Sequence, residues 1–407
     1  MKNEVAAIAV VVTLLVGVGV GYLFIPAPAA RTTSIVSETT VTHNSTFTTT
    51  NTMTVTWTEA TMGQVPSITT IETGNTSISG SPDEIVVNPA TNMLYITDMF
   101  SGNLTVVNGS SGKVTGTIVL PPSAEPVVTG IAVDSDTNTI FVSTSRPAIF
   151  AIDGATNEII RFIPVSATID TVDPQRQLLY ATQGRMTLPN STGSLLVMSE
   201  VSGSLIANVS LNGYPSSVVL NPATNLLYVP ACQSEAPVCN PEVLVVNGTT
   251  NRVAERIPIP GTGYTGFVLD PGSNHAYLIV DSNVIELVSI DLNTYKTNSS
   301  IIVRSNCDDM SLIGINPSRG ELYATVVGLG LANLFLVIDL RGNIVSMFST
   351  PTEFITNSGT NPAKASLYLT VALPGMQGKL GFLISLPENF THGFVDTDLI
   401  ASGICTP

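Results

Sequence analysis

Residues 87–98 read VNPATNMLYITD, and this stretch decides the fold. An apolar segment runs into Asn-Pro, a short polar turn follows, and an aromatic residue lies inside a second apolar segment. Proline fixes φ near the value that the second position of a type I or II turn needs, so the stretch predicts two antiparallel strands joined by a tight turn. Residues 220–230 (LNPATNLLYVP) and 315–325 (INPSRGELYAT) repeat the pattern.

The same pattern recurs along most of the chain at nearly regular spacing. Its turn begins at an Asn or Asp that we call the turn anchor, and the anchors are Asn88, Asp134, Asp173, Asn221, Asp270, Asn316 and Asn361. Seven residues after each anchor stands an aromatic residue: Tyr95, Phe141, Tyr180, Tyr228, Tyr277, Tyr323 and Tyr368. A period of 39 to 49 residues indicates a repeat architecture in which each unit is one supersecondary element.

Each unit predicts four strands, which we label a to d. In the first unit they are residues 84–87, 93–97, 103–107 and 114–120. Strand c is a continuous apolar run in later units (SLLVM, EVLVV, ELVSI, LFLVI and GFLIS), which predicts burial on both faces. Repeated four-stranded sheets of this kind predict an all-β fold, a seven-bladed β-propeller of four-stranded antiparallel blades. A parallel β-helix is the alternative, although its turns are shorter than this period.

Closure of the ring requires a strand from one chain end to complete the last blade. Residues 67–73 (SITTIET), ahead of the first unit, are the favoured candidate, and residues 392–399 near the other end are the alternative. Either strand would join the two ends of the chain and seal the ring.

The repeated units resemble YVTN-type β-propeller repeats, which carry an apolar strand, NP-x-T-N, and an aromatic-led strand that ends in Val-Thr-Asn or similar. The resemblance covers about residues 75–390, and it departs from the pattern at strand ends such as LYVPA and IFVST. It implies a propeller of an extracellular or cell-surface protein, many of which are archaeal. The family has no single activity, so the resemblance does not imply a function.

Composition excludes several classes of protein. Only 11% of the 407 residues are charged, against roughly 25% in an ordinary soluble domain. The net charge is −15, which excludes a nucleic-acid binder because phosphate contacts need clustered Lys and Arg. The mean hydropathy of +0.37 suggests either many membrane spans or blades buried on both faces. Only one apolar run reaches the length of a span, so the second explanation is favoured.

That run, residues 5–25, is long enough for a helix across a bilayer core. We therefore predict three regions: a membrane anchor or signal segment (1–30), an extended Thr/Ser-rich stalk (31–66) and the propeller (67–407). A retained single-pass anchor with an extracellular propeller is the preferred interpretation, and secretion after cleavage at Ala29 is the alternative. Threonine occupies every even position from Thr46 to Thr58, which indicates either a plain spacer or a strand that pairs with another chain.

The repeats also predict a polar ring at the mouth of the central channel. Five residues before the anchors stand Asp83, Thr129, Thr168, Ser216, Thr265, Ser311 and Thr356, and nearby acids are Glu84, Asp170, Asp308, Asp309 and Glu353. Such a mouth could bind a cation, a sugar or a cationic group. Alternatively, the hydroxyls bond the backbone of the neighbouring blade.

Two b–c loops, residues 183–193 and 231–242, are longer than the others and belong to neighbouring units. They lie on the same predicted face as the mouth, where variable loops on a rigid scaffold commonly bind ligands. A protein or glycan ligand on this face is the partner that we expect, unless the loops reflect neutral drift.

The cysteines and the glycosylation sequons fit an extracellular location. We predict disulfides Cys232–Cys239 and Cys307–Cys405, one of three pairings that four cysteines allow. Candidate N-glycosylation sites are Asn44, Asn75, Asn103, Asn108, Asn190, Asn208, Asn247, Asn298 and Asn389.

Catalytic and metal motifs are weak. None of the three histidines has an evident partner for nucleophilic catalysis, and no zinc-ligand set occurs. Residues 134–138 resemble the start of a calcium loop, but Thr139 and Ser145 stand where that loop needs Gly and an acid. We predict no catalytic residue, metal or cofactor, and a binding or cell-surface structural role. The alternative is a secreted lactonase-like hydrolase or quinoprotein-like oxidoreductase, with Asp83, Asp170 and Asp308 at the channel mouth.

Overall fold

The computed structural model describes residues 74–78, 81–98, 101–121, 127–185, 192–235, 238–281, 284–303, 310–326, 333–350, 354–361, 366–372 and 381–387. Within these ranges, no helix has the length and hydropathy needed to cross a bilayer. The apolar run 5–25 and the Thr-rich stalk both lie outside them.

The fold is an all-β propeller of antiparallel, mostly four-stranded sheets. Six sheets consist of strands that follow one another in the chain, and we number them as blades 1 to 6. Blade 1 comprises β2 (Pro82–Asn88), β3 (Met93–Asp98), β4 (Leu104–Asn108) and β5 (Lys113–Ile118). Blade 2 comprises β6 (Val128–Asp134), β7 (Thr139–Thr144), β8 (Ala148–Asp153) and β9 (Glu158–Ile163). Blade 3 comprises β10 (Thr168–Asp173), β11 (Leu178–Arg185), β12 (Thr192–Ser199) and β13 (Leu205–Ser210).

Blades 4 to 6 follow the same order, with one irregularity. Blade 4 comprises β14 (Tyr214–Pro215), β15 (Val219–Asn221), β16 (Leu226–Glu235), β17 (Val238–Asn247) and β18 (Arg252–Pro258). Blade 5 comprises β19 (Tyr264–Asp270), β20 (His275–Asp281), β21 (Ile285–Asp291) and β22 (Lys296–Val303). Blade 6 comprises β23 (Met310–Asn316), β24 (Glu321–Val326), β25 (Asn333–Asp339) and β26 (Ile344–Thr350). In blade 4 the inner strand is split, because β14 and β15 both pair with β16.

A further sheet joins the two ends of the described chain. Its strands are β27 (Phe354–Asn361), β28 (Ser366–Ala372), β29 (Gly381–Pro387) and β1 (Gly74–Ile78), and β1 pairs with β29 in antiparallel register. The closing strand therefore comes from the N-terminal side, as predicted. Its predicted position was wrong, since the strand begins directly after residues 67–73, which lie outside the described ranges.

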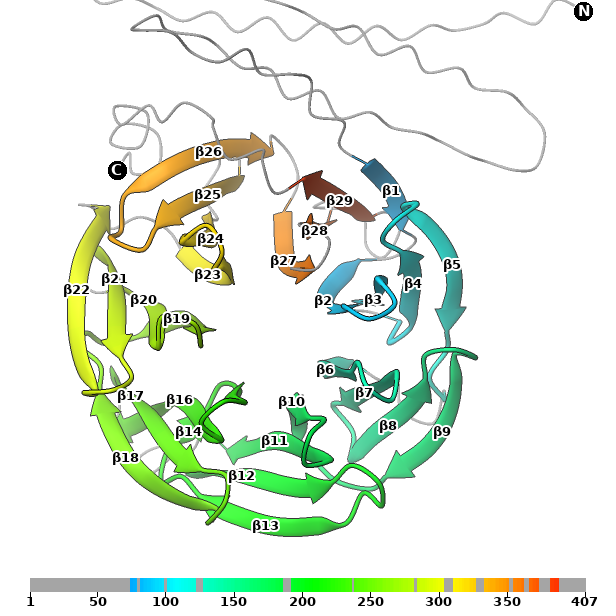
Figure 1. Cartoon of the computed structure of the whole chain (residues 1–407), viewed down its shortest axis with the longest axis horizontal. Coiled ribbons are helices and arrows are strands. Elements are labelled where there is room, and N and C mark those ends of the chain that lie inside the picture. Colours follow the sequence, from blue (N-terminus) through cyan, green and yellow to red (C-terminus); the bar gives the residue numbers. More distant parts are fainter. Residues whose placement is uncertain are drawn as a thin grey trace, which may run out of the picture. The chain divides into compact units, whose positions relative to one another are not determined.

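The sheets surround a common axis, with the first strand of each blade innermost and the last at the rim (Figure 1). Each inner strand contacts the inner strand of the next sheet, and β27 of the closing sheet contacts β2 of blade 1. This arrangement places every sheet between two others, as a propeller requires.

The hydrophobic cores lie between neighbouring sheets. One core combines Tyr95 and Leu104 of blade 1 with Ile140 and Val142 of blade 2, and equivalent cores join blades 2 to 6 in sequence. Strand β8 of blade 2 is buried at every position except its last. Both faces of strand c are therefore covered, which explains the low charge and positive hydropathy without further membrane spans.

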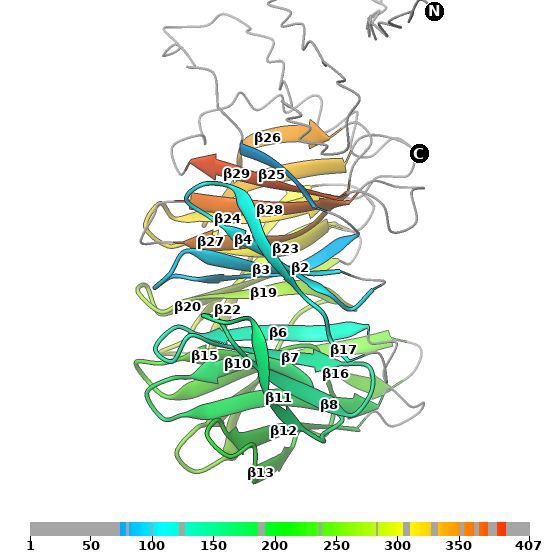
Figure 2. The same ribbon diagram turned by 90° about the vertical axis from the view of Figure 1, so that its right-hand side faces the viewer.

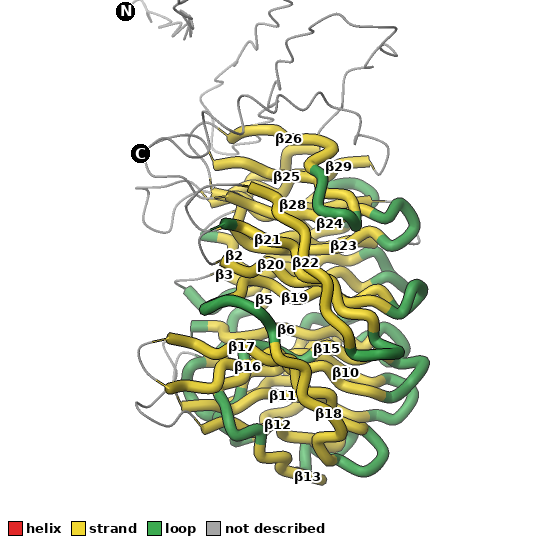
Figure 3. The backbone as a smooth tube through the Cα atoms, turned by 90° about the vertical axis from the view of Figure 1, so that its left-hand side faces the viewer, coloured by secondary structure: helices red, strands yellow, loops and turns green. Residues whose placement is uncertain are grey.

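The turn anchors have a local structural role. Side-chain oxygens of Asn88, Asp134, Asn221 and Asp270 each accept a backbone N–H two residues further on, at 2.7–3.1 Å. Four residues after each of these four anchors the backbone is left-handed, as at Asn92 (φ 56°). These short a–b turns and the c–d turns lie along one side of the ring, which we call the turn face (Figures 2 and 3).

Candidate functional site

The predicted mouth residues of the described chain lie on the inner strands. Asp83 and Glu84 are on β2, Thr129 on β6, Thr168 and Asp170 on β10, Thr265 on β19, Ser311 on β23, Thr356 on β27, and Ser216 falls between β14 and β15. Asp308, Asp309 and Glu353 lie outside the described ranges.

The inner strands are irregular at these positions. The pairing register shifts between Pro82 and Ile85 in β2, between Val128 and Gly130 in β6, and between Ile169 and Thr171 in β10. Strands β19, β23 and β27 show the same interruption. A bulge leaves a residue unpaired and redirects its side chain. The breaks coincide with Asp83, Glu84, Thr129, Asp170 and Thr356, whereas Thr168, Thr265 and Ser311 stay paired beside them.

Several of the hydroxyls bond neighbouring strands or blades. Thr129 Oγ1 lies 3.0 Å from Ser143 Oγ, and Ser143 Oγ accepts a 3.0 Å bond from the Ile169 amide of blade 3. Thr265 donates its hydroxyl hydrogen to the carbonyl oxygen of Met310 in blade 6. The Thr265 contact matches the alternative in which a hydroxyl bonds the backbone of the neighbouring blade, whereas Thr129 bonds within blade 2.

Ser216 takes part in a different contact. The hydroxyl of Tyr264 in blade 5 donates a 2.8 Å hydrogen bond to Ser216 Oγ in blade 4. Burial raises the pKa of Tyr264 to about 12, with Tyr214 adding a smaller effect in the same direction. A partly buried tyrosine of blade 5 therefore meets a serine hydroxyl of blade 4 where two neighbouring inner strands begin.

Asp170 is held by two strands. Its Oδ2 accepts a 2.8 Å hydrogen bond from the Thr182 amide of β11, and its carboxyl group also accepts a backbone hydrogen bond from Val218 of blade 4. Val218 lies in the break between β14 and β15, so the split inner strand of blade 4 receives this carboxyl group. Burial raises the pKa of Asp170 to about 8 despite these hydrogen bonds.

Glu84 is the second unusual acid. Burial, followed by the charge of Asp83, raises the pKa of Glu84 to about 7, although a backbone hydrogen bond from Ile131 of blade 2 opposes the shift. The pKa of Asp83 is raised as well, first by burial and then by Asp98. Glu84 also raises the pKa of Asp170, so acids of blades 1 and 3 influence each other electrostatically.

The described parts of the predicted loops of blades 3 and 4 are strand. Strands β11 and β12 pair from Leu178–Ser199 to Arg185–Thr192, and β16 and β17 pair from Leu226–Asn247 to Glu235–Val238. The prediction of loops over 183–193 and 231–242 was wrong there, because continued pairing satisfies backbone groups that a loop would leave to solvent. These two hairpins extend from the side opposite the turn face, which we call the hairpin face (Figure 3).

A disulfide joins Cys232 and Cys239 across the blade 4 hairpin, as predicted. Behind it, Arg256 Nη1 and Gln233 Nε2 both bond Glu242 Oε1, at 2.6 and 2.8 Å. Arg256 also donates to the carbonyl oxygen of Leu211, at 3.0 Å. Cys307 and Cys405 lie outside the described ranges, so their predicted bridge stays a prediction.

The segment before β15 fills the space between the two hairpins. A Cβ added to Gly193 would lie 2.2 Å from Pro215 Cδ, and one added to Gly184 would lie 2.9 Å from Tyr214 Cδ2. Strand β14 also pairs with β16. Two glycines thus let Tyr214 and Pro215 pack closely between the hairpins, and the three elements form a continuous surface.

Sequence reasoning did not identify Tyr214, Tyr264 or Asp98 as site residues. Tyr214 lies in a d–a connection, where the repeats share no sequence pattern. Tyr264 stands next to the predicted Thr265, and its aromatic ring was the available signal. Groups of three or more His, Cys, Asp or Glu that could hold a metal are absent from the described part of the chain.

Sequons occur both on exposed strands and in hydrogen-bonded turns. Asn208 on β13 and Asn298 on β22 are exposed at the rim of the ring. Asn108 and Asn247 begin c–d turns, and the side-chain oxygen of each accepts backbone hydrogen bonds from its own turn. Asn44, Asn190 and Asn389 lie outside the described ranges.

Comparisons with known proteins support the fold alone. No protein-family model and no curated protein matches the sequence. Among solved structures, Kuenenia stuttgartiensis hydrazine synthase is similar with a TM-score of 0.60 and 15% identity, over 74% of this chain and 97% of that one. The Cps50 (Swd1) β-propeller domain of Myceliophteria thermophila gives a TM-score of 0.57 and 10% identity, over 76% and 98%. Likeness at this identity carries no function.

Proposed function

We propose that this chain is a membrane-anchored, extracellular, seven-bladed β-propeller related to the YVTN-type repeats, and that it acts as a binding module at the cell surface. Residues 5–25 would anchor it, the Thr-rich stalk would hold the propeller away from the membrane, and the hairpin face would bind a protein or glycan ligand.

One observation carries the binding role. Neighbouring blades 3 and 4 have longer paired b and c strands than the other described sheets, with 8 residues in each of β11 and β12 and 10 in each of β16 and β17. Both hairpins project from the face where the inner strands begin (Figure 3). The Cys232–Cys239 disulfide and the contacts of Glu242 brace the longer hairpin. A rigid projection on a propeller scaffold is the arrangement by which many repeat proteins position a binding surface.

The chemistry of this face suits a polar ligand with apolar patches, such as a glycan. Tyr214 and Tyr264 supply aromatic rings, Ser216 a hydroxyl group, and Gln233 an exposed amide. Aromatic rings with a polar end are common in binding sites because one side chain offers both apolar contact and a hydrogen bond. Few charges lie among these residues, which fits a neutral ligand better than a highly charged one.

The Cys232–Cys239 disulfide supports the proposed extracellular location. Disulfides persist in oxidising compartments and are rare in the cytosol of mesophiles. The apolar run and the stalk sequence agree with an anchored protein on that side of the membrane. Protease treatment of intact cells tests this directly: the full-length chain should be cleaved without lysis, and protection until lysis would refute the proposed location.

Binding is tested with purified full-length protein on an array of neutral and acidic glycans and on surface glycoproteins. Tyr214→Ala, and the double change of Cys232 and Cys239 to Ser, should each weaken binding at least tenfold. Ala155→Ser on the turn face is the control and should bind as the unmodified protein does. Equal losses in all three variants, or binding that survives both hairpin-face changes, would refute the assignment to this face.

A second function is favoured by the acids of the inner strands. With pKa values of about 7 and 8, Glu84 and Asp170 keep a proton near neutral pH, as a general acid must. A propeller hydrolase would use such a group, and lactone hydrolysis by purified protein is the test. Turnover that is lost in Glu84→Gln or Asp170→Asn would support it, and absence of turnover in the unmodified chain would refute it.

A further inference from the structure

The c–d turn of blade 3 differs from those of its neighbours at its first residue. That residue is Gly109, Gly154 and Gly248 in blades 1, 2 and 4, but Glu200 in blade 3. In all four blades its amide donates a hydrogen bond of 2.8–2.9 Å to the left-handed residue of the a–b turn in the same blade. The positions are therefore equivalent, and a carboxyl group stands where blades 1, 2 and 4 have no side chain. In blade 5 the equivalent residue is Leu292, whose amide donates to the carbonyl oxygen of Asn274 at 3.0 Å, so Glu200 differs by its charge.

Steric contacts explain the glycines of blades 2 and 4. A Cβ on Gly154 would lie 2.5 Å from Asn138 Oδ1, and a Cβ on Gly248 would lie 2.5 Å from Asn225 Oδ1. In blade 3 the left-handed residue is Gln177 instead of asparagine, with φ of 54°. Blade 3 therefore differs from blades 2 and 4 at both positions: Gln177 replaces the asparagine, and Glu200 replaces the glycine.

The Glu200 side chain meets the turn anchor of the preceding blade. Asp134 is 1% exposed and Glu200 is 5% exposed. Thr137 Oγ1 lies 2.7 Å from Asp134 Oδ2 and 3.4 Å from Glu200 Oε1, so one hydroxyl touches both carboxyl groups. Glu200 Oε2 is buried and receives no hydrogen bond from a protein donor.

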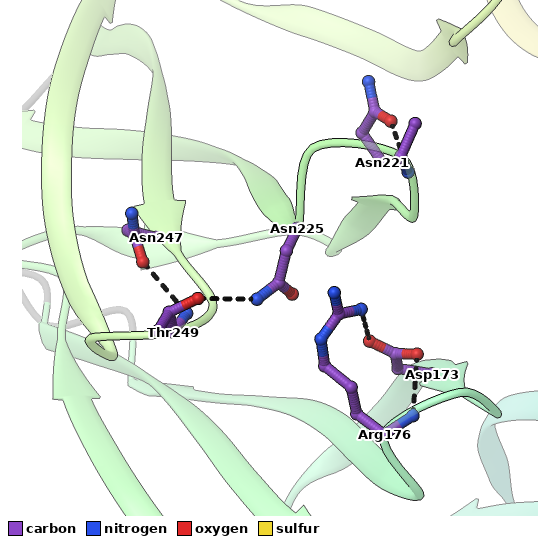
Figure 4. Close-up of polar contacts among 7 residues, drawn as sticks. Asp173, Arg176, Asn221, Asn225, Asn247 and Thr249 are labelled. Atoms are coloured by element: carbon purple, nitrogen blue, oxygen red, sulfur yellow. Dashed lines mark hydrogen bonds and ion pairs between the residues drawn. The ribbon is translucent and has the colours of Figure 1, made fainter.

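The next interface shows how an acidic anchor is otherwise balanced. Asp173, the anchor of blade 3, is paired at 2.8 Å with Arg176, three residues further on in its own turn (Figure 4). In the anchor turn of blade 2 the equivalent residue is Thr137, which carries no charge. Asp134 thus faces a second acid without a cation in its own turn.

We propose that Asp134 and Glu200 share one proton at neutral pH, and that this acid–carboxylate hydrogen bond joins blade 2 to blade 3 until rising pH removes the proton. Two ionised carboxylates this deeply buried would repel each other strongly, and a single shared proton converts the repulsion into a hydrogen bond. A proton on Glu200 Oε2 would also give that buried oxygen a role, as the donor to Asp134.

The electrostatics of the site agree with this geometry. Burial, followed by the hydrogen bond and charge of Asp134, raises the pKa of Glu200 to about 8. Burial pushes the pKa of Asp134 upward, but hydrogen bonds from Glu200, Thr137 and Asp136 outweigh it and hold the pKa below its usual value. The proton therefore resides on Glu200, and Asp134 accepts it.

Other charged groups around the pair do not replace the proton. Arg161 of β9 lowers the pKa of Glu200, but its Nη1 bonds the backbone oxygen of Glu200 at 2.6 Å. Asp136 is exposed and donates only its amide to Asp134, at 2.7 Å. A divalent cation is the alternative occupant, yet a hard cation such as Ca²⁺ takes six to eight oxygen ligands, and this buried pair offers two carboxyls and one hydroxyl.

Thermal unfolding of the detergent-solubilised full-length chain between pH 6 and pH 9 tests the proposal. Glu200→Gln keeps the shape and a hydrogen-bond donor toward Asp134 but cannot titrate, and Glu158→Gln changes an exposed acid of the neighbouring β9 as the control. The unmodified chain and Glu158→Gln should lose Tm more steeply across this range than Glu200→Gln, by about 3 °C or more.

The same pH slope in the unmodified chain and Glu200→Gln would overturn the proposal. If Glu200→Gln does not fold, Asp134→Asn takes its place and should also flatten the slope. A third set of scans at pH 9 adds millimolar calcium or EDTA. An increase in Tm with calcium that occurs in the unmodified chain and is absent from Glu200→Gln would assign the site to a cation and overturn the shared proton.

Discussion

The side-chain amide of Asn88 donates a 2.7 Å hydrogen bond to Oδ1 of Asn138, and so links the turn anchor of blade 1 to the left-handed turn residue of blade 2. The same Asn88 side chain accepts the Ala90 amide at 3.0 Å and is fully buried. One repeat residue thus builds its own turn and fastens the next blade.

Asn88→Ala should lower the free energy of unfolding by about 1–3 kcal/mol, because it leaves a buried acceptor and a turn amide without partners. Asn108→Ala is the matched control, since Asn108 also accepts amides of its own c–d turn. Chemical denaturation measures both variants. A loss in Asn108→Ala as large as that in Asn88→Ala would mean that the turn, and not the link between blades, accounts for the effect.

Gly130→Ala should destabilise the ring severely. A Cβ at this position would lie 2.3 Å from the carbonyl oxygen of Ile169 on the next inner strand, a backbone atom that cannot move aside cheaply. We expect a loss of more than ~2 kcal/mol or failure to fold. Gly263→Ala is the control, because a Cβ there meets no atom within 4 Å, and it should stay within ~1 kcal/mol. Similar Tm values for both variants would contradict close packing of the inner strands.

Stability should fall as pH rises through the range in which Asp170 and Glu84 titrate. Their folded pKa values of about 8 and 7 exceed those of the unfolded chain, roughly 4, so the folded state binds more protons between these limits. The stabilising effect is complete below about pH 4 and is lost as pH rises toward 8. Asp170→Asn should flatten the decline in Tm from pH 5 to pH 9.

The control for that measurement is Glu255→Gln, which removes an exposed acid on β18. It should show the same pH slope as the unmodified chain. A slope in Asp170→Asn that equals that of Glu255→Gln would show that Asp170 is already ionised in the folded protein.

Removal of the Cys232–Cys239 disulfide should affect the hairpin more than the ring. The bridge spans a sequence separation of 7, and the entropy of so short a loop corresponds to about 2 kcal/mol. The double change of both cysteines to Ser should lower Tm slightly and open the blade 4 hairpin to limited proteolysis. Reduction of the unmodified protein should reproduce the cleavage pattern, and cleavage spread evenly over all blades would contradict a local role.

The rim sequons should differ in their glycan content. Asn208 and Asn298 are exposed on outer strands, whereas the side chain of Asn247 holds its own turn. Mass spectrometry of glycopeptides from surface material should therefore find occupancy at the first two positions and less at Asn247. Bare peptides at Asn208 and Asn298 from protein exposed at the cell surface would contradict this order.

The repeat period, the turn anchors and the buried strand c could all be predicted because they depend on residues close together in the chain. Asn-Pro with an aromatic seven residues later encodes one hairpin, and a continuous apolar run encodes a strand covered on both sides. The Cys232–Cys239 bridge was also local, since the two cysteines lie in one hairpin with a sequence separation of 7.

The predictions failed where pairing between distant or variable segments decides the structure. The length of the blade 4 hairpin depends on how far β16 and β17 keep pairing, and the polar sequence there resembles a loop. The closing strand β1 depends on which N-terminal segment fits β29 at the other end of the chain. Glu200 was visible as an acid where blades 1, 2 and 4 have glycine, but its meaning required the position of Asp134 in another blade.

The sequence by itself determined a ring of four-stranded repeats, because each repeat carries its own turn signals and apolar strands. Only the tertiary structure decided what the polar residues of those repeats do. Thr265 bonds to the backbone of blade 6, Asp170 enters the break in blade 4, and Asp134 meets Glu200. Packing of one blade against the next creates these contacts, and no pattern within a single repeat encodes the residue that the next blade presents.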